Sequence, residues 1–145
     1  MIKLTLGILL ITFYSACCNR VDCEQTSYSA DFRILSKENN TDLLFGPTHI
    51  YNPHKIKVFA LINSDTVYYN TELSYVLQDS SLYVEFDPPV NPAYMQFEDG
   101  DIDTLNVYTW TSTEKCCSHL MKVVEFQHNG AERIENEYPT TALYK

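Results

Sequence analysis

Hydrophobic and polar residues alternate over short runs along most of this chain. Leu82, Val84 and Phe86 are separated by Tyr83 and Glu85, which is the period of a strand with one buried face. No long window shows the period of an amphipathic helix. Turn residues separate the runs roughly every 8–12 residues, a spacing typical of a β-sandwich or barrel. The pattern therefore predicts an all-β fold.

We predict about eight strands from nine runs that are rich in β-branched and aromatic residues. Pro88, Pro89 and Pro92 exclude a regular strand between 87 and 92, because proline lacks the backbone N–H of a strand ladder. Asn129-Gly130 is a strong hairpin signal before the last run. The expected fold is a single immunoglobulin-like or transthyretin-like β-sandwich. The runs are 30–35, 41–45, 55–62, 66–69, 73–77, 82–86, 104–111, 119–127 and 131–136.

Lys3 precedes an apolar run at 4–13. A membrane-spanning helix needs about 20 apolar residues, so this run is too short to span a membrane and instead has the length of a signal-peptide core. Ser15-Ala16-Cys17 follows it and resembles the lipobox of bacterial lipoproteins. That resemblance implies cleavage between Ala16 and Cys17 and a lipid on the Cys17 sulfur. The alternative is an ordinary secretory signal followed by a chance cysteine.

The predicted leader divides the chain into three parts. Residues 1–16 are a signal peptide, 17–29 are a polar, lipidated tether, and 30–145 are the β-sandwich domain. The lipobox resemblance implies more than one acyl chain, such as palmitate, on Cys17, and dual acylation is enough for stable anchoring. We therefore expect a lipoprotein of the bacterial cell envelope, anchored to the outer membrane, with its domain in the periplasm or at the cell surface.

The chain contains five cysteines, and lipidation of Cys17 leaves Cys18, Cys23, Cys116 and Cys117 in an oxidising compartment. We expect at least one disulfide that joins Cys18 or Cys23 to Cys116 or Cys117. The alternatives are a bridge between the adjacent Cys116 and Cys117, or a metal site at 116–119. Adjacent strand residues point to opposite faces, so this pair suits two partners better than one ion. No metal is predicted.

The composition of the chain excludes several classes of protein. The 145 residues are 45% hydrophobic and 20% charged, which excludes a disordered chain and a protein with several membrane spans. The formal net charge of −9 repels phosphate backbones and disfavours nucleic acid as a partner. The four glycines lie far apart, so the chain has no glycine-rich phosphate loop. No cofactor is expected.

Several features stand together mainly in the last third of the chain: a cysteine near the tether, Asp101 to Leu105 at the start of a strand, Cys116-Cys117, and a Val-Glu-Phe run before Asn129-Gly130. With these features the chain resembles small lipoproteins of Bacteroidetes-type bacteria. This resemblance brings no catalytic residue with it. It implies that Asp65-Thr66-Val67 and Asp103-Thr104-Leu105 match the short O-glycosylation sequon of those bacteria, whereas the alternative is that both are plain strand starts.

The sequence contains neither a Gly-x-Ser-x-Gly elbow nor a His-Glu-x-x-His motif. His49 and His54 flank the segment 46–53, and we interpret them as solvated loop residues, with a metal or acid–base role as the alternative. The acidic residues of 98–103 do not match the spacing of an EF-hand, so we expect a solvated hairpin tip there. We predict no catalytic residue.

Tyr108 and Trp110 lie two residues apart in the predicted strand 104–111 and therefore share one face. Leu105, Val107 and Thr109 take the other face. If the aliphatic face is core, the aromatic face points outward, and such aromatic platforms hold sugars or protein partners. The alternative is that Tyr108 and Trp110 form the core side, since a lone tryptophan in a β-sandwich is commonly buried.

Two functions fit these observations. The favoured one is a non-catalytic, membrane-anchored module for binding or envelope structure, with a protein or a carbohydrate as its partner. The alternative is a small envelope enzyme or metal-handling protein that uses His49 and His54, or Cys116–His119. The second requires histidine, cysteine and acidic groups that converge on one point. The absence of catalytic motifs favours the first.

Overall fold

The computed structural model describes residues 28–76, 79–98, 100–113, 120–137 and 139–145. The chain divides into two compact units, one of residues 27–110 with 121–145 and one of residues 1–26 with 111–120. In the second unit, the Ser112 N–H donates to the Leu120 carbonyl over 3.0 Å. The strands lie in the first unit, apart from Thr111 at the end of one of them.

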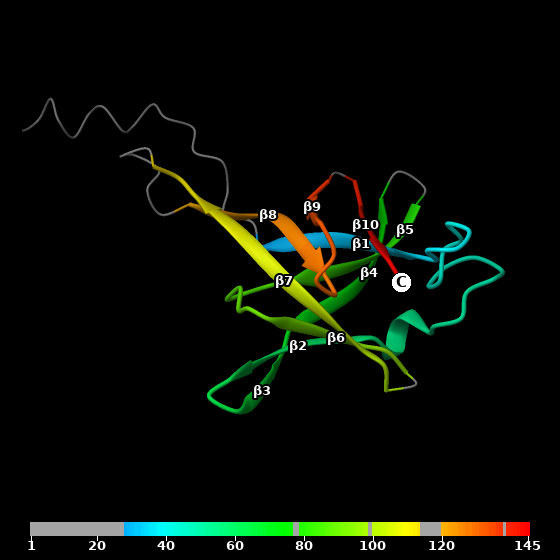
Figure 1. Cartoon of the computed structure of the whole chain (residues 1–145), viewed down its shortest axis with the longest axis horizontal. Coiled ribbons are helices and arrows are strands. Elements are labelled where there is room, and N and C mark those ends of the chain that lie inside the picture. Colours follow the sequence, from blue (N-terminus) through cyan, green and yellow to red (C-terminus); the bar gives the residue numbers. More distant parts are fainter. Residues whose placement is uncertain (1–27, 77–78, 99, 114–119, 138) are drawn as a thin grey trace, which may run out of the picture. The chain divides into compact units, whose positions relative to one another are not determined.

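The described residues form ten strands and one short 3-10 helix, arranged in two sheets (Figure 1). The smaller sheet has the order β10-β1-β5-β4 and the larger has the order β3-β2-β6-β7-β8-β9. The prediction of an all-β sandwich is therefore confirmed. The elements are β1 (Ser29–Leu35), η2 (Pro53–Lys55), β2 (Lys57–Ile62), β3 (Asp65–Tyr68), β4 (Asn70–Val76), β5 (Asp79–Glu85), β6 (Ala93–Gln96), β7 (Ile102–Thr111), β8 (Met121–His128), β9 (Arg133–Glu135) and β10 (Thr141–Tyr144).

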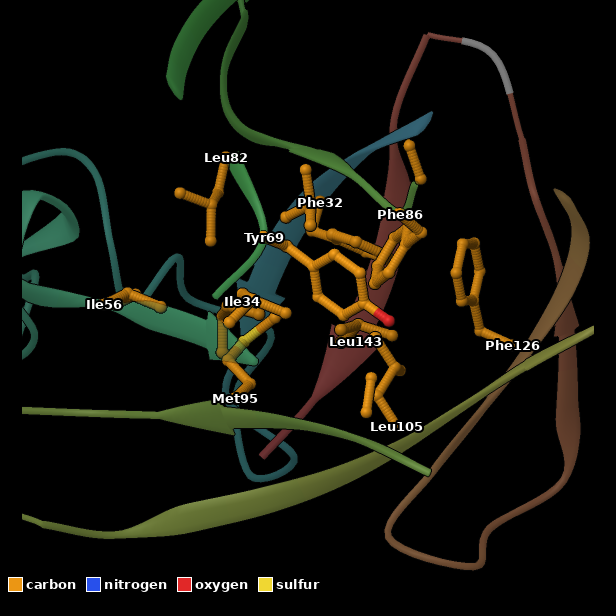
Figure 2. Close-up of a cluster of buried hydrophobic side chains, with 14 of the residues drawn as sticks. Phe32, Ile34, Ile56, Tyr69, Leu82, Phe86, Met95, Leu105, Phe126 and Leu143 are labelled. Atoms are coloured by element: carbon orange, nitrogen blue, oxygen red, sulfur yellow. The ribbon is translucent and has the colours of Figure 1, made fainter. Parts of the chain in front are cut away.

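The inner faces of the two sheets meet in one hydrophobic core. Phe32 of β1 lies at its centre, with its ring 4.8 Å from that of Phe126 on β8 and 6.1 Å from that of Phe86, which follows β5. Figure 2 shows these rings together with aliphatic side chains from both sheets, among them Leu143 and Leu105. Aromatic edge contacts across the core therefore hold the two layers together.

The chain passes from the larger sheet to the smaller one at Tyr69, between β3 and β4. The buried Tyr69 hydroxyl donates to the Pro88 carbonyl over 3.0 Å and accepts from the Val90 N–H over 3.1 Å. The next residue is Asn91, whose side chain donates to the Val107 carbonyl and accepts from the Val107 N–H, both over 2.6 Å. A strand ladder is impossible in the proline-rich segment 87–92. Hydrogen bonds between side chains and backbone groups, made by Tyr69 and Asn91, therefore hold this segment instead.

Three strand predictions need correction. The run 41–45 is not a strand, because the Asp42 carboxylate accepts from the N–H groups of Leu44 and Phe45, each over 2.9 Å, and turns the chain there. Its apolar residues still reach the core from this loop. β6 and β10 were not predicted, and both are only four residues long. The other boundaries differ by a few residues; β1 begins at Ser29, within the predicted tether.

Replacement of Phe32 by Ala should destabilise the domain by about 3–5 kcal/mol, because the side chain is fully buried and its loss leaves a cavity between the sheets. Chemical unfolding followed by circular dichroism measures this change. Tyr75→Ala is the control, since Tyr75 is 76% exposed and its removal should change stability by less than about 0.5 kcal/mol. Similar losses in both variants would contradict the assigned core.

Candidate functional site

The central strand β7 turns its aliphatic side chains inward and its aromatic side chains outward. Leu105 and Val107 are buried, whereas Tyr108 is half-buried and Trp110 is 46% exposed. The interpretation of Tyr108 and Trp110 as the core side is therefore wrong, and the outward orientation is correct. The physical reason is that Leu105 and Val107 face the smaller sheet, so the opposite face of β7 must point away from the core.

Cationic side chains flank both aromatic rings on this outer face. The Arg133 guanidinium lies 3.9 Å from the Tyr108 ring centroid, and the Lys122 ammonium lies 5.5 Å from that of Trp110. The Tyr108 hydroxyl also donates to Gln127 Oε1 over 3.2 Å. The Tyr108 ring is thus fixed by contacts with β8 and β9, while Trp110 presents more free surface.

Three further rings lie on the same outer side of the larger sheet. Phe59 of β2 stacks on Tyr94 of β6 with a centroid separation of 5.4 Å, and it lies 5.8 Å from the Tyr68 ring of β3. Their strand neighbours, such as Val58 and Met95, point into the core, so the rings point outward. We call these five residues the outer aromatic face: Phe59, Tyr68, Tyr94, Tyr108 and Trp110. The sequence analysis did not identify Phe59, Tyr68 and Tyr94 as part of this face. Finding them would have required both the alternation in 55–62 and the cross-strand register.

A buried polar cluster interrupts the core at the start of β7. Asp103 is 4% exposed, and its Oδ2 atom lies 2.9 Å from both His128 Nε2 and Lys145 Nζ. The other oxygen, Oδ1, accepts from Asn129 Nδ2 over 2.8 Å. Burial by itself raises the pKa of Asp103, but the hydrogen bonds from His128, Asn129 and Lys145 outweigh burial and hold that pKa well below its usual range.

Lys145 joins this cluster from the smaller sheet. Its backbone N–H donates to the Leu35 carbonyl over 2.8 Å, beside β1, and its ammonium lies 2.5 Å from the Asp101 carboxylate. The Phe97 ring centroid lies 4.2 Å from the same nitrogen. Burial lowers the pKa of Lys145, but hydrogen bonds to Asp101 and Asp103 outweigh it and raise that pKa above its usual value. The Asp103 cluster, made of Asp103, His128, Asn129 and Lys145, therefore ties the two sheets together.

The predicted solvated tip at 98–103 needs a partial correction. The segment does connect β6 to β7, and Glu98 forms an exposed ion pair with Lys55. Asp103, in contrast, is buried, because it lies on the inner side of β7 in phase with Leu105. Among the described residues, no group of three or more His, Cys, Asp and Glu side chains is placed to hold a metal ion.

The two loop histidines do not form a common group in the described part of the chain. His49 is exposed, and its Nδ1 atom lies 2.7 Å from the Gly46 carbonyl oxygen. His54 lies in η2 and lines a shallow hollow of about 300 Å³ together with Leu73 and Leu82. Both residues are thus solvent-accessible, as interpreted from the sequence.

The remaining sequence predictions lie outside the described residues. They concern the leader at 1–16, Cys17, Cys18 and Cys23, and the segment Cys116–His119 with Cys116 and Cys117. No helix among the described residues is long and apolar enough to cross a membrane. The first sequon-like segment, Asp65-Thr66-Val67, is exposed on the edge strand β3. In the second, Asp103 is buried and Thr104 is half-buried.

Comparisons with known proteins identified no relative of this chain. No family model, no curated protein and no solved structure matches this chain.

The ion-paired Asp103 cluster should make the domain sensitive to acid. Because the folded-state pKa of Asp103 lies below the unfolded value of about 3.9, the stabilisation is fully present above that value and is lost as the pH falls below it. Thermal unfolding of the protein with Asp103 and Lys145 in the ion-paired form, measured across the acidic range, should show this decline.

Asp103→Ala should remove the Asp103 part of that acid dependence and cost about 3–5 kcal/mol at neutral pH, because Lys145 then loses a buried partner. Glu125→Gln is the matched control, since it breaks only the exposed pair with Arg133 and should change stability by less than about 1 kcal/mol. Unchanged stability in Asp103→Ala would show that the cluster does not support the fold.

Proposed function

We propose that this protein is a lipoprotein of the bacterial cell envelope, anchored to the outer membrane through Cys17, and that its β-sandwich is a non-catalytic binding module. The leader pattern and the Ser15-Ala16-Cys17 junction support the anchor. A disulfide from Cys18 or Cys23 to Cys116 or Cys117 would join the tether to the segment between β7 and β8. Such a bridge would keep the domain oriented close to its anchor.

The proposed binding surface is the outer aromatic face. The observation that carries this proposal is the exposure of Trp110, which lies on a central strand of the larger sheet and is nevertheless 46% exposed. Large aromatic side chains that remain on a surface among polar residues mark interaction sites, because they offer much apolar area and some polar edges. Tyr68, at 59% exposure, extends this surface to the opposite edge strand.

The partner is proposed to be a carbohydrate or a protein. Rings on the strands of a sheet form a rather flat surface, which suits the C–H face of a sugar or an apolar patch of a protein. Gln127 and Asn106 lie among the rings and form a side-chain hydrogen bond of 3.1 Å with each other. They offer amide groups beside the aromatic surface. The cations Lys57, Lys122 and Arg133 lie next to rings of this face.

Lipidation should determine where the protein is found. Replacement of Cys17 by Ala removes the sulfur that would carry the lipid, so the mature chain should move from the membrane fraction to the soluble fraction. Intact-mass measurement of the wild type should show an acylated N-terminal Cys17. Cys18→Ala is the matched control and should stay in the membrane fraction. A wild-type mass with no acyl group would contradict the proposed anchor.

Replacement of Trp110 or Tyr108 by Ala should abolish or strongly weaken binding while changing stability by less than about 1 kcal/mol, because neither side chain is part of the core. Trp110 is the single tryptophan of the chain, so its fluorescence reports directly on a ligand at this face. We would titrate purified bacterial polysaccharides and envelope proteins against the wild type.

The control for this experiment is Tyr75→Ala, which removes an exposed ring from β4 of the smaller sheet and should leave binding unchanged. A large loss of stability in Trp110→Ala would show that the residue is structural. Equal binding by Trp110→Ala, Tyr108→Ala and the wild type would place the binding surface elsewhere.

A further inference from the structure

The Asp103 cluster places an amine nucleophile against a carboxyl carbon inside the domain. Lys145 Nζ lies 2.9 Å from Asp103 Oδ2, so it is one carbon–oxygen bond away from the carboxyl carbon Cγ. The two side chains are 13% and 6% exposed, and the Phe97 ring centroid lies 4.2 Å from the nitrogen. Water therefore has little access to the contact, and the two groups are held together by the fold.

We infer that Lys145 and Asp103 condense to form an intramolecular amide, an isopeptide bond that joins the two sheets covalently. The Nζ lone pair attacks Cγ, the N–C bond forms and the Cγ–Oδ2 bond breaks. The two protons that leave the lysine nitrogen depart with Oδ2 as one water molecule. No oxidant, reductant or other reactant is needed, so the folded chain is sufficient for the reaction.

The neighbours of the pair supply the groups that such a reaction uses. The Asp101 carboxylate lies 2.5 Å from Nζ and can accept the first proton as a general base. Asn129 Nδ2 donates to Oδ1 over 2.8 Å, where negative charge develops during the attack. His128 Nε2 lies 2.9 Å from Oδ2, the oxygen that must be protonated before it leaves. Each of the three residues therefore contacts a reacting group.

The ion pair is the starting state of this reaction, and it must convert to the neutral amine and acid before the attack. Burial favours that conversion, whereas the hydrogen bonds within the cluster and with Asp101 oppose it, so the neutral pair is the minor form. An amine and a carboxylic acid carry no charge, and a proton shift along the Nζ–Oδ2 hydrogen bond produces them from the ion pair. Fixed proximity raises the effective concentration of two reacting groups by several orders of magnitude, up to about 10⁸ M in oriented systems. The bond would form slowly, after folding has assembled the cluster from β7, β8 and the end of β10.

Peptide mapping of the full-length protein, purified from the membrane fraction, tests this inference. After reduction and alkylation, trypsin cuts after Lys57, Lys115 and Arg133. We expect a branched peptide in which 58–115 is joined to the segment that begins at Ile134. Its mass should equal the sum of the two peptides less one water molecule, and fragmentation should place the link between Asp103 and Lys145. Two separate, unmodified peptides, even after prolonged incubation at neutral pH, would overturn the inference.

Lys145→Arg and Asp103→Ala are the matched controls, and neither should give the branched peptide. Lys145→Arg keeps a cation beside Asp103 and Asp101, so it should fold even if Asp103→Ala does not. Asp101→Asn should form the bond several-fold more slowly, because the general base is lost. A water loss of equal size in Lys145→Arg would place the modification elsewhere and contradict the proposal.

The bond also changes the acid response in a measurable way. An amide carries no charge, so cross-linked molecules lack the titration of Asp103 and should unfold at a higher temperature in acid than ion-paired ones. Lys145→Arg should show the acid sensitivity in full. This readout separates a covalent link from a salt bridge that merely supports the fold.

Discussion

The alternation of side chains along β7 is the constraint on which the rest of the domain depends. One side of this strand faces the smaller sheet and carries Leu105 and Val107, together with the buried Asp103. The other side carries Tyr108 and Trp110, which remain partly exposed. Because successive side chains must point to opposite faces, the placement of the aliphatic residues in the core also determines the position of the aromatic surface and of the buried carboxylate.

The centre of the core and the start of β7 are held by different physical interactions. Around Phe32 the sheets meet through aromatic and aliphatic contacts, which depend on area and have little directional preference. At the start of β7 they meet through Asp103 and Lys145, whose hydrogen bonds have fixed lengths and directions. A buried ion pair of this kind adds little net stability over a hydrophobic pair, but its loss leaves an unpaired charge. It therefore restricts how the sheets can shift relative to each other.

The sequence was a good guide to the fold class, because alternation with a period of two survives in most strands. It failed at 41–45, where the Asp42 side chain turns a β-rich run into a loop, and at β6 and β10, which are too short to show a pattern. The orientation of β7 stayed open, because Leu105 and Trp110 are both plausible core residues. The two faces of β7 can be told apart only once it is known which of them the smaller sheet covers.

The Asp103 cluster could not be found from the sequence, for a different reason. Its members come from β7, from β8 and the turn after it, and from the residue after β10. Nothing in the local spacing of Asp103 indicates that Lys145 is its partner. The stretch from Glu98 to Asp103 reads as an acidic, solvated turn, whereas Asp103 lies within β7 on its inner side and is buried, unlike the exposed Asp101 before the strand. Long-range pairing of this kind becomes visible only when both sheets are in place.

The parallel pairing of β1 with β10 has a consequence for how the domain folds. β1 lies between β5 and β10, and Phe32 is opposite Thr141, so an early segment completes its sheet only with a very late one. Contacts between distant segments require the closure of a long loop, which slows folding. During folding, β1 must therefore wait with one edge unpaired until the segment at 141–144 arrives. In this interval the chain is most exposed to wrong strand pairing and aggregation.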